Sequence, residues 1–226
     1  MSDMTLLAGL PYETALVGFL TLIAYLLLLM IGDCASGIPA ARLLLRPRGF
    51  VLIRAGWRRW FRLALRSCCL STLVVCVILL IPALLHCPGS QTLLAWLLFT
   101  LHMEAVAAVQ VLLMALFEKA TSAMTPVVLV QFASVLSSQR FSGASALLLP
   151  GNWGSLARTK EYEHQNLFEI LSQRSVAQSL SREHFREFVS ANTHGGFPLW
   201  AAFALNIAVI LLIALFGWRL VRRKRL

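Results

Sequence analysis

Two ionisable side chains stand inside a long apolar run, and they are the first candidates for chemistry. His102 and Glu104 lie near the middle of residues 92–117. An ionisable group at that depth in a bilayer is costly unless it faces protein or water, so such groups often mark ion, proton or substrate pathways. The alternative is structural, namely a hydrogen bond to another span or an acid that stays neutral. No lysine or arginine lies inside another apolar run to pair with Glu104.

The familiar catalytic patterns are missing from the sequence. There is no GxxxxGK[ST] loop, residues 143–147 lack the second glycine of a nucleophile elbow, and the five histidines lack zinc-binding spacing. We therefore expect no enzyme, no catalytic residue, no metal and no cofactor in this chain. One alternative remains, a membrane enzyme acting at the outer face. Its cluster would come from Glu161, Glu163, His164, His184 and Glu187.

Residues 50–66 form a basic, amphipathic stretch. Arg54, Arg58 and Arg62 are spaced by four and would share one face of a helix. The aromatic residues of the stretch suit the headgroup level of an interfacial helix. Such a helix is either a simple anchor for the next span or a docking helix for a cytoplasmic partner. The candidate partner contacts are Arg54, Trp57, Arg58, Arg59, Arg62 and, at the next cytoplasmic turn, Glu118.

The elements that position these residues are membrane-spanning helices. Apolar residues make up 58% of the 226 residues and charged residues 13%, whereas soluble domains are nearer half and a quarter. Helix is required because backbone groups in lipid must be satisfied within the segment. The sequence predicts an all-α, polytopic membrane bundle of about five spans. The predicted spans are residues 12–31, 68–85, 92–117, 123–138 and 197–218.

The net charge of +10 comes from basic residues between and after the apolar runs, not from a soluble basic patch, so we expect no nucleic-acid partner. The connection of residues 33–66 and the tail after residue 218 carry most of the excess, and the positive-inside rule places both in the cytoplasm. Four predicted spans lie between these two segments, and an even number of spans places both segments on the same side of the membrane. The prediction is a multi-pass protein of the cell (plasma or inner) membrane with its N-terminus outside.

Residues 139–196 are then external, and their charges are balanced. Residues 141–156 are apolar but interrupted by glycine and proline, and are too short to cross a bilayer. A re-entrant or interfacial stretch is expected, buried against protein. Apolar stripes around residues 167–171 and 185–189 predict two short amphipathic helices on the outer surface.

This order of elements resembles the small permease subunits of ABC-type exporters, of the kind found with peptide-export and bacteriocin-immunity ATPases. Residues 52–61 (LIRAGWRRWF) look like the coupling helix of those permeases, and residues 149–153 (LPGNW) are similar to the external segment before their last span. That family usually has six spans, whereas five are predicted here.

The resemblance implies a function and a set of partners. A cytoplasmic ATPase, which would carry the ATP and Mg²⁺, would dock on the basic helix. Two permease chains, identical or different, would then export or extract a peptide or lipid-like substrate. Besides the permease and the outer-face enzyme, a further hypothesis is a non-catalytic scaffold or assembly subunit of a larger membrane complex.

Overall fold

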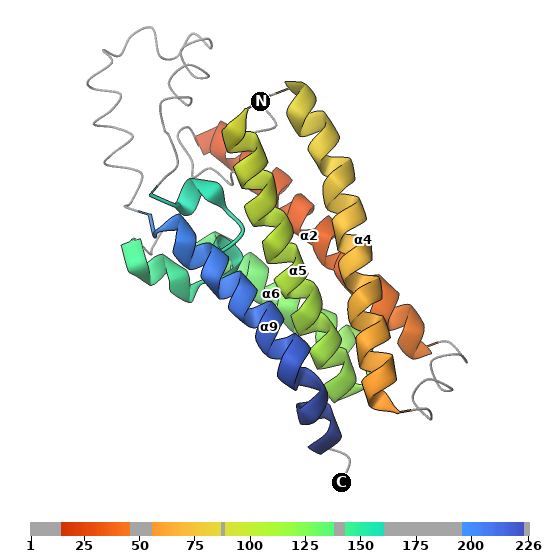
Figure 1. The fold of residues 1–226 in the computed structure, drawn as a ribbon. Coiled ribbons are helices and arrows are strands. Elements are labelled where there is room, and N and C mark those ends of the chain that lie inside the picture. The colour runs from red at the N-terminus through yellow and green to blue at the C-terminus, as the bar shows by residue number, and fades with distance from the viewer. Residues whose placement is uncertain (1–14, 46–55, 87–88, 138–142, 161–195, 224–226) are drawn as a thin grey trace, which may run out of the picture.

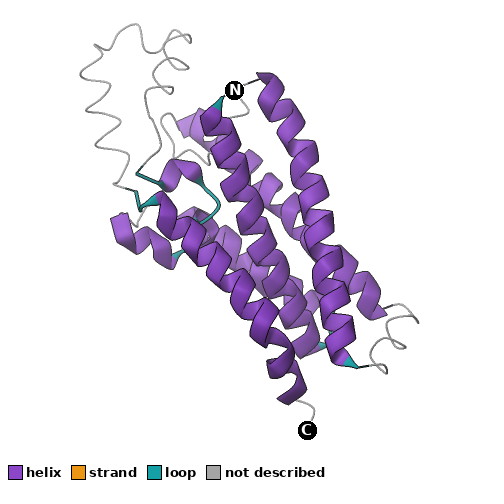
Figure 2. Ribbon diagram, viewed as in Figure 1, coloured by secondary structure: helices purple, strands orange, loops and turns teal. Residues whose placement is uncertain are grey.

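The computed structural model describes residues 15–45, 56–86, 89–137, 143–160 and 196–223 (Figure 1). Five of its helices are long and apolar enough to cross a membrane. No strand occurs among the described residues (Figure 2), so the predicted all-α bundle is confirmed. The five helices are α2 (Ala15–Leu45), α4 (Trp57–His86), α5 (Ser90–Phe117), α6 (Ala120–Ser137) and α9 (Leu199–Arg223).

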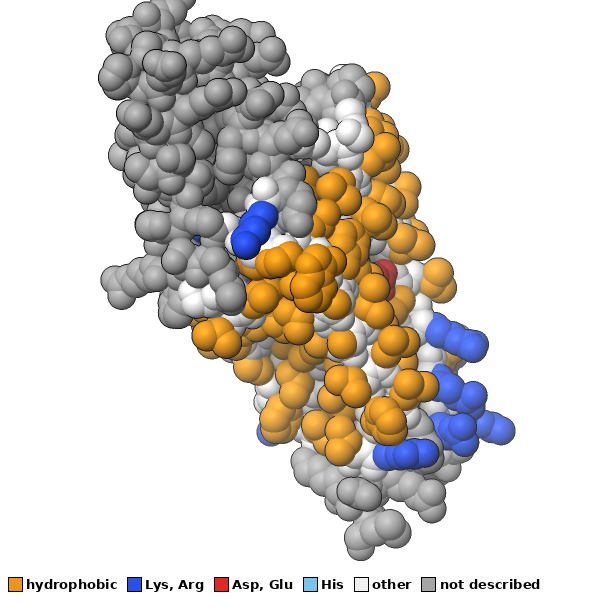
Figure 3. Space-filling model, turned by 60° about the vertical axis from the view of Figure 1, so that its left-hand side comes forward, with side chains coloured by type: hydrophobic (Ala, Val, Ile, Leu, Met, Phe, Trp, Pro, Cys, Tyr) orange, Lys and Arg blue, Asp and Glu red, His pale blue; other side chains and the backbone are white. Residues whose placement is uncertain are grey.

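Helix α5 is the centre of the bundle. All four of the other long helices pack against it. Its sequence explains this position, because it is apolar on every side and carries small residues where neighbours approach closely. Ala95, Ala107 and Ala108 are fully buried at such contacts. The outward faces of the surrounding helices are also apolar, and Figure 3 shows them as a hydrophobic flank with most of the visible Lys and Arg gathered at one end.

The first long helix continues past the predicted end of the first span. Residues 12–31 were expected to end at Gly32-Asp33, but α2 continues to Leu45. Asp33 was placed in the predicted cytoplasmic connection. It is instead fully buried, because it shares one helical face with Leu29, Ser36 and Ala40, which are also buried. The connection predicted as residues 33–66 is therefore much shorter.

From residue 57 onward, the predicted basic interfacial helix is part of α4 and not a separate helix. Those residues form the first turns of α4, which begins at Trp57 rather than at residue 68. Trp60 and Phe61 are 0% and 1% exposed, so they pack in the core of the bundle. The physical reason is close packing against α9, where Phe61 lies directly over Gly217. Residues 46–55, including Arg54, lie outside the described residues.

The other spans lie close to the predicted ranges. Helices α5 and α6 cover residues 90–117 and 120–137, against predictions of 92–117 and 123–138. Helix α9 covers 199–223 and so extends past the predicted end at 218. The main differences in span position are thus confined to α2 and α4.

The apolar stretch before residue 160 folds back against the bundle. It forms three short 3-10 helices, η2 (Gly143–Leu148), η3 (Pro150–Asn152) and η4 (Leu156–Arg158), and η3 packs on α6. The stretch ends at a clamp, in which Phe197 N–H donates to Arg158 O (3.1 Å) and Lys160 N–H donates to Phe197 O (3.0 Å). Lys160 and Gly196, the described residues on either side of 161–195, therefore lie at one place on the bundle. The two predicted amphipathic helices lie outside the described residues.

Candidate functional site

His102 is the hub of a buried polar cluster that joins three spanning helices. Its Nδ1 lies 3.1 Å from Oδ1 of Asn206 on α9, and its Nε2 lies 3.2 Å from Oε1 of Gln131 on α6. The three side chains are 0% to 3% exposed. We call His102, Gln131 and Asn206 the polar triad. It is a crosslink between the central helix and two of its neighbours.

The orientation of Asn206 is fixed by its own donors. Its Nδ2 donates to the backbone oxygens of Trp153 (3.2 Å) and Ala202 (3.0 Å). Its amide oxygen is then left to accept from His102, so Nδ1 of a neutral ring carries the proton. Nε2 of that ring is consequently an acceptor, and it faces the carboxamide of Gln131. This second contact is the adaptable one, because no other hydrogen bond among the described residues fixes which end of the Gln131 amide is presented.

The turn around η3 is held rigidly against the triad. Trp153 Nε1 donates to Leu147 O (2.9 Å), and Asn152 Nδ2 donates to Ala146 O (3.2 Å). Two glycines permit the close approach. A Cβ on Gly154 would lie 2.8 Å from Cδ2 of His102, and one on Gly151 would lie 2.7 Å from the backbone oxygen of Gln131.

A cavity of about 300 Å³ adjoins the triad, between α5, α6 and α9. Pro150 and Trp153 of the turn line one part of it, and all three triad residues contribute to its wall. The rest of the lining is apolar, and it contains no Lys, Arg, Asp or Glu. The volume is at the lower end of the range for small-molecule sites, which are typically concave and apolar with a few polar groups.

Glu104 does not belong to this site. It lies two residues beyond His102, on the side of α5 that faces α4, where its carboxyl group hydrogen-bonds with the side chain of Cys69. The predicted pair of His102 and Glu104 is therefore divided between two surfaces of one helix. The triad partners were missed, although Gln131 and Asn206 are the lone amides of their apolar runs. That isolation was the available signal.

A second buried polar group lies between α2 and α5 and was also missed. The hydroxyl oxygen of Ser36 lies 2.8 Å from Gln110 Oε1 and 2.9 Å from Asp33 O, so the hydroxyl group can donate a hydrogen bond to either acceptor. Both carboxyl oxygens of Asp33 are buried and have no hydrogen-bond partner among the described residues. A Cβ on Gly37 would meet Gln110 Oε1 at 2.6 Å, so this glycine allows the two helices to approach.

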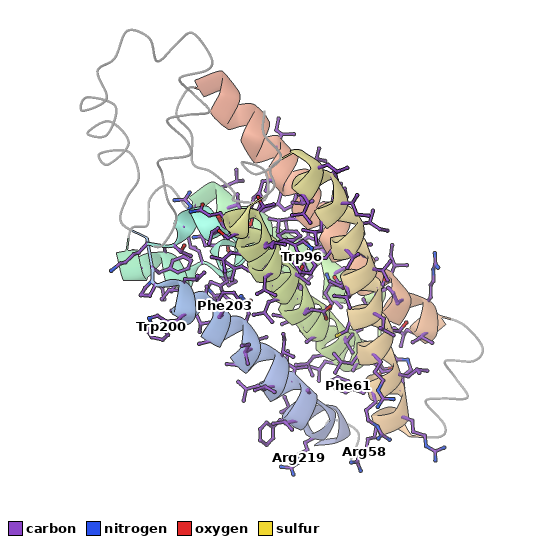
Figure 4. All side chains as sticks on the ribbon, turned by 45° about the horizontal axis from the view of Figure 1, so that its top comes forward. Arg58, Phe61, Trp96, Trp200, Phe203 and Arg219 are labelled. Carbon is purple, nitrogen blue, oxygen red and sulfur yellow. The ribbon has the colours of Figure 1, made fainter. Side chains whose placement is uncertain are left out.

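The predicted docking residues that the structure describes lie at one end of the bundle. Arg58, Arg59 and Arg62 are exposed on the first turns of α4. Glu118 is exposed at the end of α5, in a left-handed conformation with φ of 59°. Figure 4 shows Arg58 and Arg219 at this same end, beyond Phe61. Arg54 and the side chain of Trp57 lie outside the described part of the chain.

The described residues contain no group of three or more His, Cys, Asp or Glu side chains placed to hold a metal ion. No protein-family model, no curated protein and no solved structure matches the chain. Fold and site together define a class: a multi-pass, all-α membrane protein of five spanning helices with a buried polar triad beside an apolar cavity.

Proposed function

We propose that the chain is the membrane-spanning permease subunit of an ABC-type exporter, working with a separate cytoplasmic ATPase. The observation that carries this proposal is the basic end of the bundle. We define the basic end as the exposed side chains Arg42, Arg58, Arg59, Arg62, Arg66, Lys119 and Arg219. They come from α2, α4, α9 and the α5–α6 turn, while Glu118 is the one acid among the described residues there.

The charge of this end supports both orientation and docking. The positive-inside rule favours a cytoplasmic position for the basic end, which puts the C-terminus in the cytoplasm and the N-terminus outside, in the plasma or inner membrane. On α4, Arg58, Arg62 and Arg66 recur every four residues and form one exposed face. An arginine face of this kind suits an acidic groove on an ATPase, where charge complementarity selects the partner.

The packing of α4 supplies a route for coupling. The turns of α4 that carry the arginine face also carry Trp60 and Phe61, which are buried against the neighbouring helices. A partner that moved the arginines would therefore move α4 against α5 and α9. Farther along α4, Cys76 O accepts a hydrogen bond from Trp96 Nε1 of α5 (2.7 Å), so α4 and α5 are also joined there. ATP-driven closure of the partner would rock the bundle, and a second permease chain would complete the transporter.

Charge reversal at the basic end tests the docking site. We expect Arg62→Glu with Arg66→Glu to lower ATP hydrolysis by the copurified complex about tenfold, because two favourable pairs become repulsive. The matched control is Lys160→Glu, an exposed residue beside the clamp at the other end. Both proteins should elute as folded, monodisperse particles. Wild-type hydrolysis after the arginine reversals, or an equal loss with the lysine control, would contradict the proposed docking site.

A scaffold subunit is the second candidate, and the clamp favours it. Backbone hydrogen bonds of Arg158, Lys160 and Phe197 hold the two ends of the 161–195 insertion together. An insertion presented from a fixed base is suited to binding another membrane subunit. A stable native complex that contains this chain and no ATPase would select the scaffold over the permease.

A further inference from the structure

We propose that the cavity between α5, α6 and α9 is a binding site for a single-chain, uncharged amphiphile, whose acyl chain fills the cavity and whose hydroxyl group meets the polar triad. A monoacylglycerol has this chemistry. The inference goes beyond the proposed function, because it applies whether or not an ATPase drives the chain. It rests on where the cavity opens, what lines it, and what its polar wall can bind.

The cavity opens toward the lipid rather than toward either end of the bundle. Helices α6 and α9 both pack on α5 but make few contacts with each other. Pro126 and Val130 of α6 line the cavity and are exposed at its rim. His102 lies about 18 Å along α5 from Ser90, at about 1.5 Å per residue, which is well inside the hydrocarbon region. Molecules that reach this opening from the side therefore come from the bilayer.

The lining selects against a charged ligand group. The cavity wall contains no Lys, Arg, Asp or Glu, so an ionic headgroup would be buried without a counter-charge. Val109, Leu113 and Val209 provide the apolar surface along which an acyl chain can pack. A peptide backbone would bring several donors and acceptors, which this lining could not satisfy. The apolar part of the ligand is therefore a hydrocarbon chain.

The polar triad matches a hydroxyl group. Because Asn206 is committed to Trp153 O and Ala202 O, Nε2 of the neutral His102 ring remains an acceptor. The Gln131 carboxamide, 3.2 Å away, can turn to present either its oxygen or its N–H₂ group. A hydroxyl group both donates and accepts, so it can donate to Nε2 and accept from Gln131. The site thus has a fixed half, Asn206, and an adaptable half, Gln131.

The test uses the full chain in phosphatidylcholine nanodiscs with a monoacylglycerol that carries a diazirine in its acyl chain. We expect saturable photolabelling of cavity residues of α6 and α9, mapped by mass spectrometry. Unlabelled monoacylglycerol should compete, and an alkane of equal length should compete at least tenfold less well. Labelling that does not saturate, or that maps to the outer faces of α2 and α4, would show annular lipid only and overturn the proposal.

Two variants sharpen the test. Val209→Phe fills the cavity and should lower labelling about tenfold, whereas Leu211→Phe introduces the same side chain on the exposed side of α9 and should not. Gln131→Leu should lower the advantage of monoacylglycerol over the alkane, because the hydroxyl group keeps His102 Nε2 but loses its second partner. Equal labelling of both phenylalanine variants would overturn the proposal, as would an unchanged preference in the Gln131 variant. Mapping and competition need only the natural chain, so they decide the matter if a variant fails to fold.

Discussion

Replacing Asn206 with leucine is expected to lower the free energy of unfolding by about 2 kcal/mol, although leucine is the more apolar residue. Asn206 makes three hydrogen bonds, of which those to His102 and Ala202 O are buried and that to Trp153 O is partly buried. Leucine leaves the His102 N–H and the Trp153 oxygen without this partner in apolar surroundings, where an unpaired polar group is costly. Denaturation of the purified protein in detergent micelles, followed by circular dichroism, measures the loss.

A double variant shows whether the orphaned imidazole is the cause. Adding His102→Leu removes the unpaired donor, so the double variant should be less destabilised than the sum of the two single variants. Ala204→Leu is the matched control, since it adds a leucine on the exposed side of the same helix. If Asn206→Leu were as stable as Ala204→Leu, the triad would not hold the bundle together.

Replacing Gly151 with valine is expected to destabilise the protein by about 2–3 kcal/mol through overpacking. A Cβ at Gly151 would lie 2.7 Å from the backbone oxygen of Gln131 and 2.8 Å from Cβ of Ser134. Neither atom is the end of a flexible side chain, so the η3 turn itself must move away from α6. That movement would also shift Trp153, whose backbone oxygen holds Asn206.

The control for this prediction is Gly89→Val. Gly89 has no atom within 4 Å of its would-be Cβ, and its φ of 176° is extended backbone that valine adopts readily. The two variants thus make the same substitution in a packed and in an open place. Thermal unfolding in detergent should separate them clearly. Coincident unfolding curves would mean that the turn does not pack on α6 as described.

The sequence predicted the helices because the length and hydropathy of an apolar run determine whether it can cross a membrane. It misplaced the ends of α2 and α4, because one acid or a group of arginines looks like the end of a span when the chain is taken alone. Asp33 shows this most clearly. Leu29, Ser36 and Ala40 share a helical spacing with Asp33, but the burial of this face depends on the packing of α2 against α4 and α5.

The site was predicted only in part, for a related reason. Glu104 was recognised because an ionisable group in an apolar run is costly, and His102 was selected with it by proximity in sequence. On a helix, however, residues two apart point to different sides. The true partners come from α6 and α9, and their alignment depends on how those helices pack on α5 and on the glycines of the η3 turn. Spacing along one segment does not contain that information.

Site-specific photocrosslinking in living cells tests the proposed function most directly. A photoreactive amino acid would replace Arg62 at the basic end in one strain and Lys160 beside the clamp in another. The account predicts that the first position captures a protein with a GxxxxGK[ST] nucleotide-binding loop, that the yield changes when ATP is depleted, and that the second position does not capture it. Capture of such an ATPase at Lys160, or at neither position, would contradict the account.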